Sequence, residues 1–209
     1  LIHTYSLSHD DLPCMDNDDF RRGKPSLHKK YCEWLALLTG DFLLTYSFEL
    51  LSTHSISIEK RLKLIQILSQ RAGLEGLIGG QELDLLGEKN YAIIHLYKTA
   101  ALFQAAFEMG AVLGGEENLT PLREIGKKVG LAFQIQDDLL DYVGSTELIG
   151  KNVGDDLLEG KFTLPLIYLK DRDNAKFMQI VKLINTNKLT TKDVYELRQV
   201  LEDLNHIWE

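Results

Sequence analysis

The sequence has 209 residues, enough for one large domain or two small ones with a sizeable buried core. Hydrophobic residues make up 44% of the chain and charged residues 26%, which is the composition of an ordinary globular protein. The net charge is −8, and the sequence has neither an arginine-rich face nor a basic tail, so we expect no nucleic-acid partner.

Helical patterns dominate the sequence from its first residues. Apolar residues recur every three or four positions almost throughout, alternating strand patterns are scarce, and the chain has only four prolines. In chain order, we expect helices at residues 1–12, 28–53, 57–73, 75–87, 90–113, 119–143 and 160–170, with shorter ones at 173–186 and 190–207. Turn signals separate them, including a Thr120-Pro121 helix start. The sequence predicts an all-α protein, a single bundle of long helices.

The cysteine content and the hydropathy pattern bear on location. The only two cysteines, Cys14 and Cys32, provide no disulfide framework, which fits a reducing, cytoplasmic location. We find no apolar run of membrane-spanning length and no signal-peptide pattern, so we expect no stable membrane insertion. The chain opens within a helical pattern and its last residues carry no helix stop signal. We therefore expect it to be the middle and rear of a longer chain, lacking N-terminal helices and the extreme C-terminus.

The segment SHDDLPCMDNDDF, residues 8–20, concentrates negative charge. Pro13 is poorly tolerated inside a helix, so we expect the helix that carries Asp10 and Asp11 to end here and Asp16 to lie on the following loop. Clustered carboxylates suit Mg²⁺, which takes one or two carboxylates together with waters and substrate phosphates. A solvated acidic turn is the alternative.

A second acidic segment, FQIQDDLLD, lies in the helix expected at 119–143. Asp137 and Asp141 are four residues apart and share one helical face, with Gln134 on that face one turn earlier and Asp138 beside them. Buried carboxylates are costly unless a cation compensates them. An exposed acidic stripe is the alternative.

Basic side chains lie in or near the same segments. They are Arg21, Arg22, Lys98, Lys151 and Lys161. Each lysine taken alone is ordinarily a solvated surface residue. Together with two acidic clusters, these cations favour a metal-bridged polyphosphate, because arginine binds phosphate oxygens as a bidentate fork. We expect Asp18 and Asp19 to be loop residues that balance Arg21 and Arg22.

These motifs resemble those of the trans-prenyltransferases, the short-chain isoprenyl diphosphate synthases. Asp10-Asp11-Leu-Pro-Cys-Met-Asp16 with the following Arg21-Arg22-Gly-Lys resembles the first aspartate-rich motif of that family, and residues 133–141 resemble the second. The stretches GGQELDLLGE (79–88), YKTAALFQAA (97–106) and IGKNVGDDLLEGKFTLP (149–165) also match in order and spacing. The resemblance covers residues 1 to about 170. It implies an all-α bundle around a central cavity, usually a homodimer.

The resemblance also assigns roles. It implies Mg²⁺, on the order of three ions per active site, held by Asp10, Asp11, Asp16, Asp137 and Asp141, with Asp138 nearby. Contacts to the diphosphate of an allylic substrate are implied for Arg21, Lys98, Lys151 and Lys161. His3 and Arg22 match the site of the second substrate, isopentenyl diphosphate, with Phe133 packing beside it. Thr99 and Gln134 match polar positions near the developing carbocation.

The implied reaction condenses isopentenyl diphosphate with dimethylallyl or geranyl diphosphate by ionisation, condensation and elimination. Tyr5 lies five residues before Asp10, where a large ring resembles the cavity floor of farnesyl-making members, and Ser6 beside it adds little bulk. An ordinary core aromatic is the other interpretation of Tyr5. We expect a fifteen-carbon product, farnesyl diphosphate, with the twenty-carbon geranylgeranyl diphosphate as the close alternative.

Two rival interpretations belong to other classes. A terpene cyclase typically mixes Asn or Asp, Ser or Thr, and Glu in its second metal motif, whereas residues 137–141 are Asp-Asp-Leu-Leu-Asp. A non-catalytic subunit of a heteromeric synthase commonly loses one aspartate motif, and this chain keeps both. The family's N-terminal motif of lysine and arginine, which helps to hold isopentenyl diphosphate, is not found in the sequence.

Overall fold

The computed structural model describes residues 1–88, 90–143, 163, 166, 169, 170, 174–186, 188, 190, 192 and 193. Contacts divide the chain into two compact units, Leu1–Phe133 and Gln134–Glu209, and each is described by itself. The organisation of the chain as a single domain stays a prediction.

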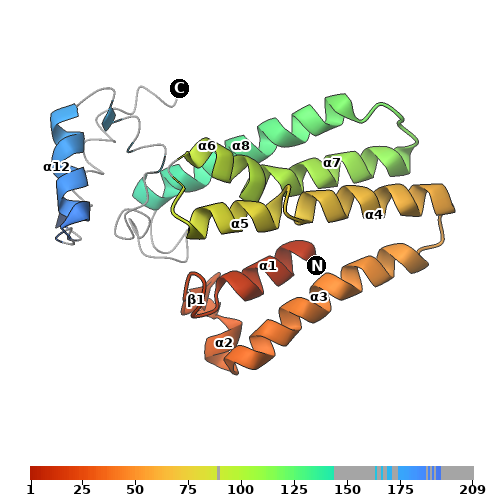
Figure 1. The fold of residues 1–209 in the computed structure, drawn as a ribbon, viewed down its shortest axis with the longest axis horizontal. Helices are drawn as coiled ribbons and strands as arrows, with labels where there is room; N and C mark the ends of the chain where they lie inside the picture. Colours follow the sequence, from red (N-terminus) through yellow and green to blue (C-terminus); the bar gives the residue numbers. More distant parts are fainter. Residues whose placement is uncertain are drawn as a thin grey trace. The chain divides into compact units, whose positions relative to one another are not determined.

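Helices make up nearly all of the regular structure that is described, which confirms the all-α prediction (Figure 1). They are α1 (Ile2–Asp10), α2 (Leu27–Lys30), α3 (Glu33–Thr53), α4 (Ile58–Ala72), α5 (Leu77–Leu85), α6 (Tyr91–Ile94), the π-helix η1 (His95–Ala100), α7 (Ala101–Gly114), α8 (Thr120–Val143) and α12 (Asn174–Asn185). The predicted helices at 160–170 and 190–207 lie largely outside the described residues.

The structure differs from the predicted elements between residues 20 and 32. The helix expected at 28–53 is interrupted at Tyr31 and Cys32, which separate α2 from α3. Before it, strands β1 (Phe20–Arg21) and β2 (Lys24–Pro25) form a short antiparallel hairpin that was not predicted. Arg22 and Gly23 at its tip both have positive φ, 54° and 73°, as a two-residue hairpin turn requires.

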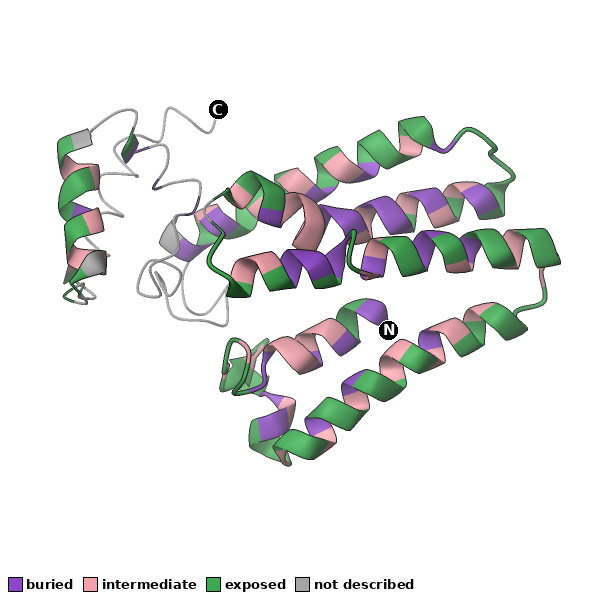
Figure 2. Ribbon diagram, viewed as in Figure 1, coloured by how far each residue is buried: buried purple, intermediate pink, exposed green. Residues whose placement is uncertain are grey.

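The first unit is built from helix pairs. Helix α1 packs against α3, α4 against α7, and α5 against η1. One core cluster gathers Ile2 and Tyr5 of α1 with Leu68 and Ala72 of α4 and Leu77 of α5. A second joins α4 to α7 through Leu64, Ile67, Ala105 and Val112. The buried faces of these helices carry the apolar positions of the 3.6-residue repeat (Figure 2).

Helix α3 corrects the expectation that no apolar segment reaches membrane-spanning length. It has 21 residues and is apolar enough by length and composition to cross a bilayer. The same composition occurs in helices of soluble proteins, and α3 packs against α1, α2 and α4. Its outward side stays apolar, with a stripe at four-residue spacing: Trp34 is 64% exposed, Leu38 54% and Phe42 60%. The Phe42 ring stacks on Tyr46 at 5.3 Å between centroids.

Candidate functional site

The first acidic segment folds as the proline predicts. Helix α1 ends at Asp10, and the backbone N–H of Asp16 donates to the carbonyl of Asp10 at 2.9 Å. This bond turns the loop back onto the helix end. Asp11 is buried, Asp10 is partly buried and Asp16 is exposed, so the three carboxylates at this end of α1 have different surroundings. Asn17, next in the loop, has a φ of 55°, a left-handed conformation that asparagine tolerates better than most residues.

Arg21 is clamped by two carboxylates of this loop. Its Nε and Nη2 both donate to Oδ1 of Asp11, at 2.8 and 2.5 Å, and Nη2 also donates to Oδ2 of Asp18 at 2.7 Å. Asp19 pairs instead with Lys29 at 2.8 Å. The prediction that Asp18 balances Arg21 is therefore confirmed, whereas the partner of Asp19 is a lysine of α2 and not Arg22.

Asp10 lies in an electrostatically crowded position. The pKa of its carboxyl is raised to about 6, chiefly by burial, while the Lys98 ammonium opposes the rise and the Asp16 carboxylate adds to it. A carboxylate in this state is destabilised by its surroundings and would be relieved by a bound cation. Hard oxygen donors of this kind fit Mg²⁺. Yet nowhere in the described ranges do three or more acidic, histidine or cysteine side chains already group closely enough to hold an ion.

Lys98 is held by a residue that sequence reasoning missed. Its Nζ donates to Oδ2 of Asp84 on α5 at 2.6 Å. The approach depends on Gly80, one helical turn before Asp84, because a Cβ at Gly80 would overlap the backbone of Lys98. The only signal for Asp84 was an acid placed four residues after that glycine.

Two further features of this region are local to α5 and η1. Gln81, next to Gly80, is buried, and neither its amide nitrogen nor its amide oxygen has a hydrogen-bond partner in the part of the chain that the structure describes. Lys98 and Thr99 lie in the π-helix η1, inside the segment predicted as an uninterrupted helix. Such π-helical turns are frequent at functional sites.

Two of the residues implied for the second substrate, His3 and Arg22, lie near each other in the first unit. Partial burial and the positive charge of Arg22 lower the pKa of His3, and Arg21 acts in the same direction more weakly. Phe133 is 51% exposed, and its ring lies 5.4 Å from the ring of Phe103. The cations of the hairpin therefore act on His3 as well as on the acidic loop.

Tyr5 is a core residue. It is 5% exposed, within the cluster that joins α1, α4 and α5. Burial, together with the nearby Asp10 carboxylate, raises the pKa of its hydroxyl, for which the described residues offer no hydrogen-bond partner. The Oγ of Ser6 donates to the carbonyl of His3 at 3.1 Å and so stays on the helix surface. A core position for Tyr5 is compatible with both interpretations of the residue.

The second acidic segment belongs to the second unit. Asp138 is 2% exposed and Asp141 7%, whereas Asp137 is exposed. The Nε2 of Gln134 donates to Oδ1 of Asp138 at 2.9 Å. Because two of the three carboxylates are buried, the exposed acidic stripe is wrong for Asp138 and Asp141. The facing arrangement of the two acidic segments stays a prediction, and Lys151 and Lys161 lie outside the described residues.

Comparisons with known proteins identify relatives. The family model for polyprenyl synthetase matches residues 1–204. The farnesyl diphosphate synthase of Bacillus subtilis (strain 168) is 42% identical over 99% of this chain and 75% of the relative. Geranylgeranyl pyrophosphate synthase 3, chloroplastic, of Arabidopsis thaliana is 44% identical over 79% of this chain but only 50% of the relative. The chain thus spans between half and three quarters of these relatives.

Solved structures are similar as well. The geranyltransferase from Helicobacter pylori, complexed with magnesium and isoprenyl diphosphate, is 36% identical with a TM-score of 0.74, over 99% of this chain and 71% of that one. The polyprenyl synthase from Caulobacter crescentus CB15, complexed with calcium and isoprenyl diphosphate, is 36% identical with a TM-score of 0.82, over 97% of this chain and 62% of that one. This chain has the all-α fold of those enzymes and belongs to the polyprenyl synthetase family.

Proposed function

We propose that the protein is a Mg²⁺-dependent prenyltransferase that condenses isopentenyl diphosphate with an allylic diphosphate, dimethylallyl or geranyl, to give farnesyl diphosphate. The observation that carries the proposal is the meeting of Asp10, Lys98 and Arg21 around the end of α1 in a chain of this family. Carboxylates for a cation and fixed positive charges for phosphate oxygens are the groups that such a substrate needs.

The metal would be held by Asp10, Asp11 and Asp16 together with Asp137 and Asp141, on the order of three ions per site. When bound, Mg²⁺ would stabilise the negative charge that develops on the leaving diphosphate. The raised pKa of Asp10 supports this assignment, because a buried carboxylate that resists ionisation gains from a cation beside it. Asp138, which is buried and accepts a hydrogen bond from Gln134, is proposed to lie beside these ligands.

Cationic side chains would supply the remaining positive charge that the diphosphate needs. Lys98 and Arg21 would bind the allylic diphosphate, and Lys151 and Lys161 are proposed for the same group. Both described cations are paired in this structure, Lys98 with Asp84 and Arg21 with Asp11, so each is oriented before substrate arrives. Preorganised charge of this kind lowers the barrier because little reorientation is needed during ionisation.

The carbocation would be kept from water by the cavity, with Thr99 and Gln134 as polar neighbours. His3 and Arg22 would hold isopentenyl diphosphate, with Phe133 beside it, and the proton lost at elimination would pass to the departing diphosphate. Tyr5 would close the cavity floor and stop growth at fifteen carbons. A twenty-carbon product is the alternative, because the Arabidopsis relative is a geranylgeranyl pyrophosphate synthase.

The assay uses the full-length gene product with isopentenyl diphosphate, geranyl diphosphate and Mg²⁺, and the products are sized after phosphatase treatment. A fifteen-carbon alcohol, absent when EDTA replaces Mg²⁺, is expected. A hydrocarbon product would identify a terpene cyclase instead. Turnover that appears only after a second synthase subunit is added would identify a non-catalytic subunit.

We further propose that the protein works as a cytoplasmic homodimer. The exposed stripe of Trp34, Leu38 and Phe42 on α3 supports the dimer, since a second copy would remove these apolar side chains from water. The two free thiols, Cys14 and Cys32, are compatible with a reducing compartment.

A further inference from the structure

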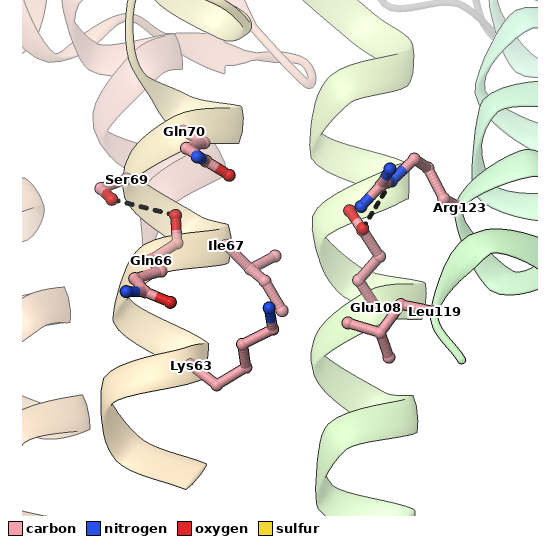
Figure 3. A pocket seen from close by; sticks show the side chains of 8 residues that line it. All are labelled: Lys63, Gln66, Ile67, Ser69, Gln70, Glu108, Leu119 and Arg123. Carbon is pink, nitrogen blue, oxygen red and sulfur yellow. Dashed lines mark hydrogen bonds and ion pairs between the residues drawn. The ribbon is translucent and has the colours of Figure 1, made fainter. Parts of the chain in front are cut away.

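A pocket of about 270 Å³ lies in the first unit between α4, α7 and the start of α8. Figure 3 shows Lys63, Gln66 and Gln70 along the α4 wall, with Glu108 and Arg123 on the opposite wall. None of these residues belongs to the prenyl reaction proposed above. Glu108 follows Lys98 by ten residues, which is about 15 Å along the helical axis. The pocket is therefore a separate site.

The base of the pocket holds a buried ionic network. Glu108 is 1% exposed, and its two carboxylate oxygens accept from two arginines: Oε2 from Arg71 Nε at 3.1 Å and Oε1 from Arg123 Nε at 2.7 Å. One carboxylate therefore faces two guanidinium groups, which leaves positive charge in excess. Each arginine uses its Nε for Glu108 and keeps further N–H donors on its two terminal nitrogens.

Lys63 adds a third cation at the mouth. Figure 3 shows its side chain reaching from α4 toward α7. Among the residues that the structure describes, Lys63 forms neither an ion pair nor a side-chain hydrogen bond. Gln66 and Gln70, on the same helix, present amide donors at the rim. Of the residues that line the pocket, Lys63 and Arg123 are cations and Glu108 is the one acid, so the local balance is positive in a protein whose net charge is −8.

The shape and the floor of the pocket limit what it can take. Ile67 and Leu119, 5% and 9% exposed, form the apolar part of a lining that is otherwise polar. Pockets for drug-sized ligands usually begin at about 300 Å³, so this one suits a smaller molecule. Excess positive charge, guanidinium donors and small size together favour a compact oxyanion.

We propose that this pocket binds a small phosphate-class anion, inorganic phosphate or diphosphate, between Lys63 and the free N–H groups of Arg123. Glu108 fixes the Arg123 side chain across the pocket and does not itself contact the anion. The site needs no metal, because its charge comes from the protein's own cations. This property separates it from the proposed reaction site, where the carboxylates need Mg²⁺ to accept a diphosphate.

The test is isothermal titration of the full-length protein with phosphate and, separately, with diphosphate, in EDTA and without Mg²⁺. Saturable binding is expected, weakened about tenfold or more by Lys63→Met, since a charge-assisted hydrogen bond is lost. Lys63→Arg should restore it. The matched control is Lys128→Met on α8, which removes an exposed lysine outside the pocket and should leave the affinity unchanged. Tighter binding of diphosphate than of phosphate would show that the pocket holds both phosphate groups.

A second variant assigns the binding to one of the two sites. Lys98→Met, in the proposed reaction site, should leave metal-free anion binding intact. No binding in EDTA, equal affinity in Lys63→Met and wild type, or loss of binding in Lys98→Met would each overturn the proposal. The titrations do not depend on prenyl transfer, so a protein that fails the prenyl-transfer assay should still bind the anion in this pocket. Because Lys63 is exposed, its variants should fold, and unchanged melting temperatures would verify this.

Discussion

Asp10 and Asp11 are neighbours in the chain, but their side chains have different surroundings. Arg21 donates two hydrogen bonds to Oδ1 of Asp11, and this charge pair compensates the burial of the Asp11 carboxylate. Asp10 has cations near it, yet burial dominates and its pKa is raised to about 6. At the scale of single residues, the fold therefore stabilises the Asp11 carboxylate, whereas the ionised Asp10 carboxylate would gain from a bound cation.

Asp10→Asn should stabilise the metal-free protein at pH 8 and not at pH 4. The folded protein binds the Asp10 proton more tightly than the unfolded chain, whose ordinary pKa is 3.8. The stabilising contribution of the proton is therefore complete below about pH 4 and is lost as the pH rises through about 6. Melting temperatures in EDTA measure this. Asp19→Asn, an exposed control paired with Lys29, should bring no such gain. A variant less stable than wild type at pH 8 would contradict this prediction about stability. The turnover of Asp10→Asn with Mg²⁺ and both substrates should fall by orders of magnitude.

Tyr5→Ala should both lengthen the product and destabilise the protein. Removing a buried ring from the cluster of α1, α4 and α5 costs about 3–5 kcal/mol. Tyr5→Phe is the control, because it removes only a hydroxyl for which the described residues offer no partner and should not lower stability. Product sizing and urea unfolding give the two readouts. An unchanged product distribution in Tyr5→Ala, with the stability lost, would leave Tyr5 as an ordinary core aromatic.

At the scale of elements, the contact between α5 and η1 sets the position of Lys98. The helices approach so closely that Gly80 meets the backbone of Lys98, and Asp84, one turn later on α5, then reaches the Lys98 ammonium. A π-helical turn places Lys98 and Thr99 differently from a regular α-helix. The packing of two helices, and not a loop, therefore orients this cation.

Gly80→Ala should push η1 away from α5 and separate Lys98 from Asp84. We expect activity to fall by about 10- to 100-fold, since small displacements of positioning groups have effects of this size. Gly110→Ala on α7 is the matched control, because a Cβ there meets nothing within 4 Å and should stabilise the helix by about 0.5–1 kcal/mol. Steady-state kinetics and melting temperatures test both variants. Wild-type kinetics in Gly80→Ala would show that the contact does not position Lys98.

These elements also show what the sequence could and could not predict. Pro13 correctly predicted that the helix carrying Asp10 ends just before it, because proline acts through local backbone geometry. The π-helical turn and the Lys98–Asp84 pair were not predicted. The pair joins residues fourteen apart through tertiary packing, which leaves no periodic signal in the chain.

At the scale of the whole molecule, the apolar outer face of α3 is the feature that a single copy leaves exposed. Trp34, Leu38 and Phe42 follow one another at four-residue spacing along a helix that packs on α1 with its other side. Large exposed aromatic and aliphatic side chains in a continuous stripe are typical of interfaces. The proposed homodimer gives this stripe a partner.

Replacing Leu38 and Phe42 together by glutamate should convert the proposed dimer to a monomer, because two copies would then bring like charges together in a desolvated interface. Sedimentation equilibrium measures the mass directly. Leu86→Glu is the control, since Leu86 is 75% exposed after α5 and away from the stripe. A double variant that keeps the mass of the wild-type dimer would remove α3 from the interface.

The π-helical turn of η1 has a consequence for how this chain tolerates length changes. Such a turn holds one residue more than an α-helical turn, and each residue of an α-helix rotates the next by about 100°. Deleting one residue within His95–Ala100 would make the helix regular and more easily formed, yet would swing Lys98 and Thr99 around the axis relative to α7. The one extra residue in η1 thus sets the direction in which Lys98 and Thr99 leave the helix axis relative to the buried side chains of α7.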